Sequence, residues 1–260
     1  MPTFLFDKIV FGPVHSRRLG VSLGINLLPV NGKLCSFDCL YCECGLNKDN
    51  KGGGGIPSRS AVKTALEETL LHMKAEGQAP DVITFAGNGE PTLHPSFSQI
   101  IDDTIALRDT YFPHAQVCVL SNATQLHKPA VLEALRRVDQ PILKFDSAFD
   151  TTVKRMDRPV STTFSVAGLV EQLKNFGDKL IIQTLFTKGS YQGLAFDNTT
   201  DEELTAWIEQ LKHIAPASVM IYTIDRDTPI ADLEKIPLET LEAIAVRVQR
   251  ETGLVVSVAG

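Results

Sequence analysis

Residues 34–45 have the sequence Leu34-Cys-Ser-Phe-Asp-Cys-Leu-Tyr-Cys-Glu-Cys-Gly45, and this stretch decides how the rest of the chain is interpreted. Its first cysteines, Cys35, Cys39 and Cys42, have the spacing C-x3-C-x2-C. Three thiolates in one short loop can hold three irons of a [4Fe–4S] cube and leave the fourth iron without a protein ligand. An open iron is where a small molecule can bind and react. The spacing therefore predicts a reactive iron–sulfur cluster held by these thiolates.

Two other uses of these cysteines are zinc binding and disulfide formation. A zinc site usually takes four ligands in two separated pairs, and with Cys44 the run bunches its thiols too tightly for that geometry. A disulfide is not expected in a chain that has 5 cysteines and no secretory signal. Cys44 is therefore interpreted as a neighbour of the cluster, and Cys118, in an apolar run, as a small core residue.

The length and composition are those of a globular protein. The chain has 260 residues, of which 43% are apolar and 22% are charged. Because no break in composition separates domains, we expect one domain, with residues 1–20 as an N-terminal extension and residues 21–260 as its body. No apolar stretch approaches the length of a membrane span, and an oxygen-sensitive cluster favours a reducing compartment. These features predict a cytoplasmic protein that does not bind membranes.

From Ser22 onward, short β-branched runs alternate with amphipathic segments. The expected strands cover residues 22–28, 81–86, 116–121, 141–146, 179–186 and 218–224. The expected helices cover residues 61–76, 96–108, a segment from 129, 162–176, 201–213 and 238–252. Strand-then-helix units in series predict an α/β fold with a parallel sheet, right-handed crossovers and the helices outside. Because six units are too few for a closed eight-stranded barrel, we expect an open, partial (β/α)6 barrel.

Polar residues stand on or just after several expected strands, where the reactive groups of such sheets collect. Lys144 and Asp146 lie two residues apart, and hence on one face, in a strand that should be apolar throughout, so each needs a partner or a ligand. The alternatives are structural: a plain glycine-rich turn, a buried ion pair and a satisfied core amide. The candidate ligand-binding residues are Gly87, Asn88, Gly89, Glu90, Ser121, Asn122, Lys144, Asp146 and Gln183.

The turn after the second expected strand has the sequence Ala86-Gly-Asn-Gly-Glu-Pro-Thr92 and resembles a Gly-Gly-Glu motif. Placed one strand–helix unit after the cysteine loop, it makes the chain similar to the radical S-adenosylmethionine (SAM) superfamily. In that superfamily SAM chelates the free iron, and one electron from the cluster cleaves SAM into methionine and a 5′-deoxyadenosyl radical. The resemblance implies a partial (β/α)6 barrel, a [4Fe–4S] cluster and SAM as cofactors, and an electron donor such as flavodoxin or ferredoxin.

The resemblance also implies roles for the candidate residues. The turn Gly87–Glu90 should contact the amino end of SAM. Tyr41, just before the third cysteine, occupies the position of a residue that flanks the adenine. In the same functional interpretation Lys144 meets a carboxylate, and Asp146 or Ser147 meets a ribose hydroxyl. The remaining candidate contacts to SAM are Ser121, Asn122 and Gln183.

Further stretches narrow the resemblance to one branch of the superfamily. Phe11–Gly20, Leu23–Asn26, Met156–Pro159 and Gln183–Gly189 are similar to the radical SAM proteins known as iron–sulfur oxidoreductases, which lie near the wybutosine tRNA-modifying enzymes. Archaeal members of the wybutosine group carry additional cysteines for a second cluster. Only two cysteines are spare here, so this chain cannot build a second full cluster, and this weakens a direct transfer of the tRNA activity.

The leading hypothesis is a radical SAM enzyme that abstracts hydrogen from a substrate bound over the strand ends. That substrate is left open among a small metabolite, a peptide and a modified nucleoside. One alternative is an activating enzyme for a glycyl-radical partner protein, and another is a non-enzymatic iron–sulfur or zinc binding module. The net charge of −6 disfavours indiscriminate nucleic-acid binding, although Arg17, Arg18 and Arg158 offer a local site for an anion. A small substrate or a peptide is therefore favoured over intact tRNA.

Overall fold

The computed structural model describes residues 4–16, 19–49 and 54–260. Arg17 and Arg18, which the sequence suggests as part of an anion site, lie outside these residues. Among the helices in the described part of the chain, none is both long enough and apolar enough to cross a bilayer.

The chain divides into two compact units. The N-terminal unit comprises residues 5–35 and 47–141, and the C-terminal unit comprises Phe4, residues 36–46 and residues 142–260. The expectation of a single domain stays a prediction.

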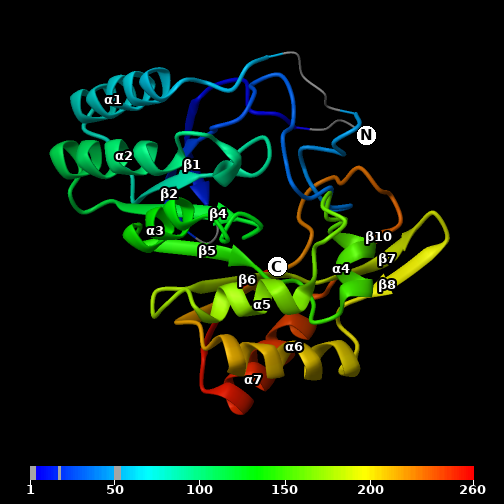
Figure 1. Ribbon diagram of the computed structural model, residues 1–260. Coiled ribbons are helices and arrows are strands. Elements are labelled where there is room, and N and C mark those ends of the chain that lie inside the picture. Colours follow the sequence, from blue (N-terminus) through cyan, green and yellow to red (C-terminus); the bar gives the residue numbers. More distant parts are fainter. Residues whose placement is uncertain (1–3, 17–18, 50–53) are drawn as a thin grey trace. The chain divides into compact units, whose positions relative to one another are not determined.

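The N-terminal unit consists of strands that are connected by helices (Figure 1). Its elements are β1 Val10–Ser16, β2 Gly20–Ile25, α1 Arg59–Ala75, β3 Val82–Phe85, the 3-10 helix η1 Pro91–Leu93, α2 Phe97–Tyr111, β4 Gln116–Ser121 and α3 Pro129–Arg137. The strands have the order β1-β2-β3-β4. β1 is antiparallel to β2, whereas β2, β3 and β4 are parallel. Helix α2 packs against both α1 and α3, so the helices form a continuous layer.

The sequence pattern explains these elements. The apolar residues Val62, Leu66 and Leu70 recur at helical spacing in α1 and are buried. Ser58 caps this helix, because its side chain accepts a hydrogen bond from Ala61 N at 3.2 Å. β3 is buried along its whole length, as expected for a parallel strand that is covered on both faces.

The C-terminal unit contains a parallel sheet and a small antiparallel sheet. Its elements are β5 Gln140–Lys144 (from residue 142 onward), α4 Asp150–Met156, α5 Val166–Lys174, β6 Ile181–Leu185, β7 Thr187–Tyr191, β8 Leu194–Asp197, α6 Asp201–Ile214, β9 Ser218–Tyr222, β10 Leu233–Lys235, α7 Leu238–Thr252 and β11 Val255–Ala259. The parallel strands have the order β5-β6-β9-β11. The antiparallel sheet has the order β10-β7-β8, and α6 packs against α5 and α7.

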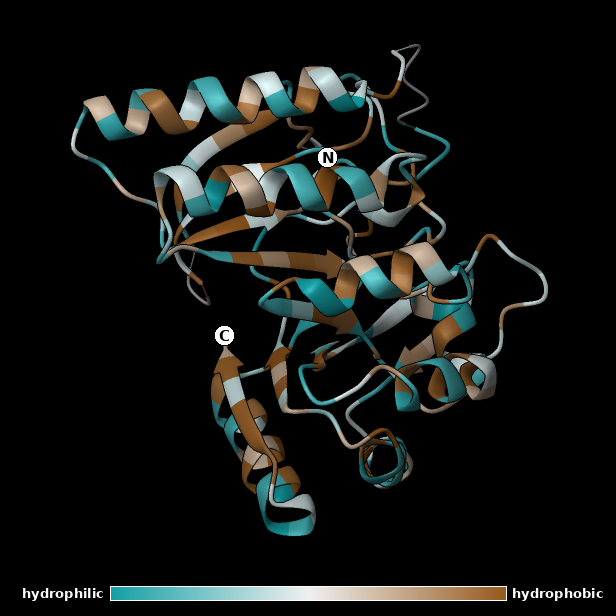
Figure 2. Ribbon diagram, turned by 60° about the vertical axis from the view of Figure 1, so that its left-hand side comes forward, coloured by the Kyte–Doolittle hydropathy of each residue, from teal (hydrophilic) through white to brown (hydrophobic). Residues whose placement is uncertain are grey.

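Hydrophobic residues concentrate along the strands and recur along the helices (Figure 2). In the C-terminal unit the rings of Phe186 and Trp207 meet edge to face, with their centroids 5.3 Å apart. The indole of Trp207 also donates a hydrogen bond to Phe145 O at 3.0 Å. These contacts fix α6 against the ends of β5 and β6, so the residues that follow β5 have a rigid support.

The expected strand–helix units are all present, and the α/β class with parallel strands is confirmed. Strands β1, β7, β8, β10 and β11 and helix α4 were not expected. β7 contains Lys, Gly and Ser and has no alternation of apolar and polar residues. α4 has 7 residues, too few to show helical periodicity. α5 begins four residues later than expected, because Ser165 caps it by accepting a hydrogen bond from Gly168 N at 3.1 Å.

Candidate active site

The thiols of the cysteine loop belong to both units. Cys35 lies in the N-terminal unit, and Cys39, Cys42 and Cys44 lie in the C-terminal unit. These four cysteines form no disulfide; Cys35 and Cys42 are partly exposed, whereas Cys39 and Cys44 are buried. Each unit holds its part of the loop through contacts of its own.

In the N-terminal unit the turn after β3 is bonded to the residue before Cys35. Leu34 N donates a hydrogen bond to Asn88 O at 2.9 Å, and Glu90 N donates one to Leu34 O at 3.0 Å. Between them, Gly89 has a φ of 135°, and a Cβ on it would lie 1.9 Å from Leu34 O. Only glycine fits this close approach, so the Gly87–Glu90 turn and the start of the cysteine loop form one structural piece.

The carboxylate of Glu90 joins this turn to the end of β4. Its Oε1 accepts hydrogen bonds from Ser121 Oγ at 2.8 Å and from both Thr92 N and Thr92 Oγ1, and its Oε2 accepts one from Asn122 N at 2.7 Å. Burial raises the pKa of Glu90, whereas these hydrogen bonds lower it, and burial prevails. Glu90 therefore orders the carboxyl ends of β3 and β4.

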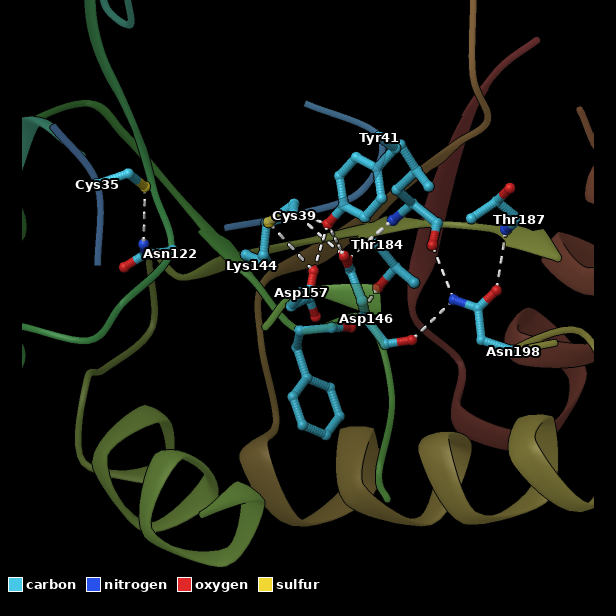
Figure 3. Close-up of polar contacts among 12 residues, drawn as sticks. Cys35, Cys39, Tyr41, Asn122, Lys144, Asp146, Asp157, Thr184, Thr187 and Asn198 are labelled. Carbon is cyan, nitrogen blue, oxygen red and sulfur yellow. Dashed lines mark hydrogen bonds and ion pairs between the residues drawn. The ribbon is translucent and has the colours of Figure 1, made fainter. Parts of the chain in front are cut away.

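Asn122 extends the same network to a cysteine. Its Nδ2 lies 3.7 Å from Cys35 Sγ and donates a hydrogen bond to it (Figure 3). Cys35, Glu90, Ser121 and Asn122, all predicted site residues, are thus connected within one unit.

Asn88 and Asn26 support the turn from behind. The buried side chain of Asn88 accepts a hydrogen bond from Phe6 N at 2.9 Å and donates to Phe6 O and Pro29 O. Asn26 Oδ1 accepts from Asn88 N at 3.1 Å, and a Cβ on Gly87 would lie 2.6 Å from that oxygen. The Asn88 side chain is therefore bonded to the main chain of Phe6 and Pro29.

In the C-terminal unit the cysteine loop runs beside residues 156–160. Phe37 and Pro159 form an isolated antiparallel bridge. Residues 156–159, one of the stretches that resemble the iron–sulfur oxidoreductases, lie directly behind the loop. The backbone hydrogen bonds are Asp38 N to Asp157 O at 3.0 Å, Leu40 N to Met156 O at 2.9 Å and Val160 N to Ser36 O at 2.9 Å.

A buried polar cluster surrounds Cys39 in this unit (Figure 3). The Tyr41 hydroxyl contacts Asp146 Oδ2, lies 2.5 Å from Asp157 Oδ1 and accepts a hydrogen bond from Lys144 Nζ at 2.5 Å. Lys144 Nζ forms an ion pair with Asp146 Oδ2 at 2.9 Å. Cys39 Sγ donates to Asp157 Oδ1 at 3.4 Å. We name Tyr41, Lys144, Asp146 and Asp157 the Cys39 polar network.

Burial and the charges of neighbouring groups shift the pKa values of residues in the Cys39 polar network. Burial raises the pKa of Asp157 to about 7, with the Asp146 carboxylate adding to the rise and the Lys144 ammonium opposing it. Burial, followed by the two carboxylates, holds the pKa of Tyr41 well above its usual range. Burial lowers the pKa of Lys144, but Asp146 and other nearby groups outweigh it, so that pKa is well above its usual range.

The remaining predicted residues also have defined places. Asp146 accepts a hydrogen bond from Leu185 N at 3.0 Å, which ties the end of β5 to β6. Gln183 is buried on β6 and lies opposite Lys144 in the register of the two strands. Gln183 thus belongs to the same unit as the Cys39 polar network.

Sequence reasoning missed the structural roles of Asp157 and Asn26. In the sequence Asp157 lies within the stretch Met156–Pro159, and nothing local shows that it contacts a cysteine 118 residues away along the chain. Asn26 gave a signal in retrospect, since it is a polar residue that ends the apolar strand Leu23–Ile25. Among the described residues its Nδ2 is a buried donor without a hydrogen-bond partner.

The chain belongs to the radical SAM superfamily, because residues 32–211, more than half of its length, match the model of that superfamily. The resemblance stated from the sequence is thereby confirmed at this level.

The chain is similar to longer proteins. It is 32% identical over 228 residues to a protein named GTPase Obg from Brachyspira hyodysenteriae, and the match covers 86% of this chain and 31% of that protein. It is 30% identical over 220 residues to a UPF0026 protein from Helicobacter pylori, covering 84% of this chain and 67% of that protein. The chain thus spans about a third of the first relative and about two thirds of the second.

Solved structures share the fold. A radical SAM methyltransferase from Sphaerobacter thermophilus has a TM-score of 0.67 at 12% identity, over 92% of this chain and 65% of that chain. SuiB from Streptococcus suis, bound to SAM, has a TM-score of 0.63 at 18% identity, over 91% and 50%. Archaeal TYW1 has a TM-score of 0.53 at 11% identity, over 89% and 72%.

Proposed function

We propose that the chain is a radical SAM enzyme that holds a [4Fe–4S] cluster through Cys35, Cys39 and Cys42. When bound, such a cluster supplies the electron that cleaves SAM into methionine and a 5′-deoxyadenosyl radical, which abstracts a hydrogen atom from the substrate. Membership of the superfamily supports this general reaction. The donor set fits the cluster, because three thiols that form no disulfide stand at the spacing C-x3-C-x2-C.

The observation that carries the proposal is the local support of the thiols. Cys35 follows Leu34, which is bonded to the turn after β3, and receives a hydrogen bond from Asn122. Cys39 donates to the buried Asp157. Thiols that are positioned before the metal arrives lose less conformational freedom on binding it, which favours a metal-binding role over a structural one.

The proposed contacts to SAM are divided between the units. In the N-terminal unit the backbone of Gly87–Glu90 binds the amino end of SAM, while the Glu90 side chain orders the turn. Each of the other candidates lies on or just beyond a parallel strand, or in the cysteine loop itself. They are Tyr41, Ser121, Asn122, Lys144, Asp146 and Gln183.

The substrate that we propose is a small anionic metabolite or a peptide, rather than intact tRNA. The net charge of −6 supports this choice. Arg158 offers an anion-binding group, since its side chain is partly exposed and lies over the ring of Tyr191 at 5.1 Å, although one nitrogen is already paired with Asp38 at 3.3 Å. A relation to the wybutosine-forming branch, flavodoxin or ferredoxin as electron donor, and a cytoplasmic location are proposed with it.

The first test is anaerobic reconstitution with iron and sulfide. We expect about four irons and four sulfides per chain, and formation of 5′-deoxyadenosine when SAM and a strong reductant are added. Replacing Cys35, Cys39 or Cys42 by Ala should abolish both, since each thiolate holds a different iron. Cys44→Ala and Cys118→Ala are the matched controls and should retain both.

Two outcomes would overturn parts of this proposal. An intact cluster in Cys42→Ala together with its loss in Cys44→Ala would reassign the third ligand. A chain that assembles the cluster but never cleaves SAM would instead be an iron–sulfur binding module. Deuterium transfer from candidate substrates into 5′-deoxyadenosine then identifies the substrate class.

A further inference from the structure

Strands β5 and β6 change their mode of contact near their carboxyl ends. Their last register pair is Lys144 and Gln183. Beyond this pair a side chain takes part, because Leu185 N donates its hydrogen bond to Asp146 Oδ1 at 3.0 Å. The position of the Asp146 carboxylate is therefore coupled to the end of β6.

Asn198 is a buried amide that lies between these strand ends (Figure 3). It directly follows β8, and its residue is 2% exposed. Its Nδ2 donates hydrogen bonds to Asp146 O at 2.9 Å and to Leu185 O at 2.8 Å. Its Oδ1 accepts a hydrogen bond from Thr187 N at 2.9 Å. One side chain thus joins the ends of β5 and β6 to the start of β7, entirely through main-chain atoms.

Asp146 and Ser147 are the two candidates for binding a ribose hydroxyl of SAM, and their contacts favour Asp146. The Ser147 hydroxyl donates to Glu203 Oε2 at 2.6 Å and accepts from Phe149 N at 2.9 Å, so it has no hydrogen left to donate. A carboxylate offers several acceptor sites and accepts stronger hydrogen bonds than a neutral hydroxyl does. Asp146 is therefore the better acceptor for a ribose hydroxyl.

We propose that Asn198 is a positioning residue that fixes the main chain of Asp146, so that the Asp146 carboxylate can bind the ribose of SAM. The inference rests on the proposed function, because it takes Asp146 as a contact to SAM. It gives the small antiparallel sheet a role, since β8 ends at Asp197 and thereby brings the next residue to the strand ends. The three hydrogen bonds involve no thiol, so the binding of iron leaves their donors and acceptors unchanged.

The first experiment compares the two parts of SAM as separate ligands. In Asn198→Ala the dissociation constants of SAM and of 5′-deoxyadenosine should each rise about tenfold, the size of a lost hydrogen bond to a charged group. Methionine has no ribose, so the concentration at which it perturbs the electron paramagnetic resonance spectrum of the reduced cluster should stay the same. Equilibrium dialysis of 5′-deoxyadenosine needs no cluster and is performed on the chain with and without iron.

Asn175→Ala is the matched control. It is the same substitution in the same unit and removes an amide that donates to Glu171 O at 2.7 Å. This variant should bind SAM, 5′-deoxyadenosine and methionine as the wild type does. A loss of 5′-deoxyadenosine affinity equal to that in Asn198→Ala would contradict the specific role of Asn198.

Amide hydrogen exchange tests the positioning itself in the chain without a cluster. Leu185 N is bonded to the Asp146 carboxylate, so its exchange rate reports whether that carboxylate keeps its place. We expect this amide to exchange faster in Asn198→Ala and at the wild-type rate in Asn175→Ala. An unchanged rate in Asn198→Ala would show that Asn198 does not hold Asp146.

Two binding results overturn the inference: unchanged affinity of Asn198→Ala for SAM and 5′-deoxyadenosine, or a loss of methionine affinity as large as that of SAM. If Asn198→Ala does not fold, Asn198→Asp supplies the test. It keeps the acceptor for Thr187 N but places a carboxylate oxygen against the carbonyls of Asp146 and Leu185, so ribose binding should weaken, and unchanged affinity would contradict the inference. A wild-type chain that assembles a cluster but does not bind SAM would instead overturn the proposed function, and this inference with it.

Discussion

Gly89 shows how much of the site depends on a missing side chain. Its φ of 135°, and the 1.9 Å that would separate a Cβ at this position from Leu34 O, leave no room for alanine. Gly177 has a similar φ of 119°, but a Cβ there would meet nothing within 4 Å. An alanine at Gly177 would therefore cause backbone strain alone, whereas an alanine at Gly89 would cause strain and also clash with the cysteine loop.

We expect Gly89→Ala to destabilise the chain more than Gly177→Ala and to lose iron. Both variants incur backbone strain on the order of 1–3 kcal/mol, but only Gly89→Ala must also displace Leu34 and, with it, Cys35. Denaturant unfolding and iron content after reconstitution are the measurements. Equal destabilisation with complete iron loading in both variants would contradict the structural role of Gly89.

Candidate site residues could be chosen from the sequence where a short local pattern points to them. Cys35, Cys39, Cys42 and the Gly87–Glu90 turn stand in short stretches whose spacing carries the chemistry. Contacts between distant segments were not predictable: His94 is buried, and its Nε2 lies 2.8 Å from Pro57 O, 37 residues away along the chain.

At the scale of elements, residues 156–160, which run from the end of α4 into a turn, support the cysteine loop from behind. Val160 N donates a hydrogen bond to Ser36 O at 2.9 Å, while its side chain is 62% exposed. The backbone contact can therefore be removed with little effect on packing.

We expect Val160→Pro to weaken cluster retention, because proline has no amide hydrogen to donate to Ser36 O. The loss of one hydrogen bond should cost about 1 kcal/mol of stability, and a chelator should remove iron faster than from the wild type. Val160→Ala keeps the amide and is the control. If proline and alanine lose iron at the same rate, residues 156–160 do not support the loop.

The long helices and buried strands could be predicted because their patterns repeat over several turns or residues. α1 and β3 are examples, with apolar residues at helical spacing and an unbroken apolar run. The antiparallel sheet β10-β7-β8 could not, since β10 has only 3 residues and its pairing joins segments far apart in the chain. α4 ends at Met156, so its omission also hid the position of Asp157.

At the scale of the whole molecule, cluster binding should raise the stability of the chain. A group that binds the folded state and not the unfolded one stabilises it by mass action, by about 2.7 kcal/mol at a hundredfold excess over its dissociation constant. We expect the anaerobic melting temperature to rise on reconstitution and to return to the starting value after chelation. Cys42→Ala should show no such rise, and equal melting temperatures with and without iron in the wild type would contradict the prediction.

The ribosome synthesises the cysteine loop before the residues that contact its thiols. Asn122 follows Cys35 by 87 residues, and Asp157 follows Cys39 by 118 residues. At translation rates of about 5–20 residues per second, the thiols precede their partners by several seconds. During this interval neither thiol has the partner that it contacts in the folded chain. We therefore expect the yield of cluster-bearing protein to depend on thiol reductants during translation.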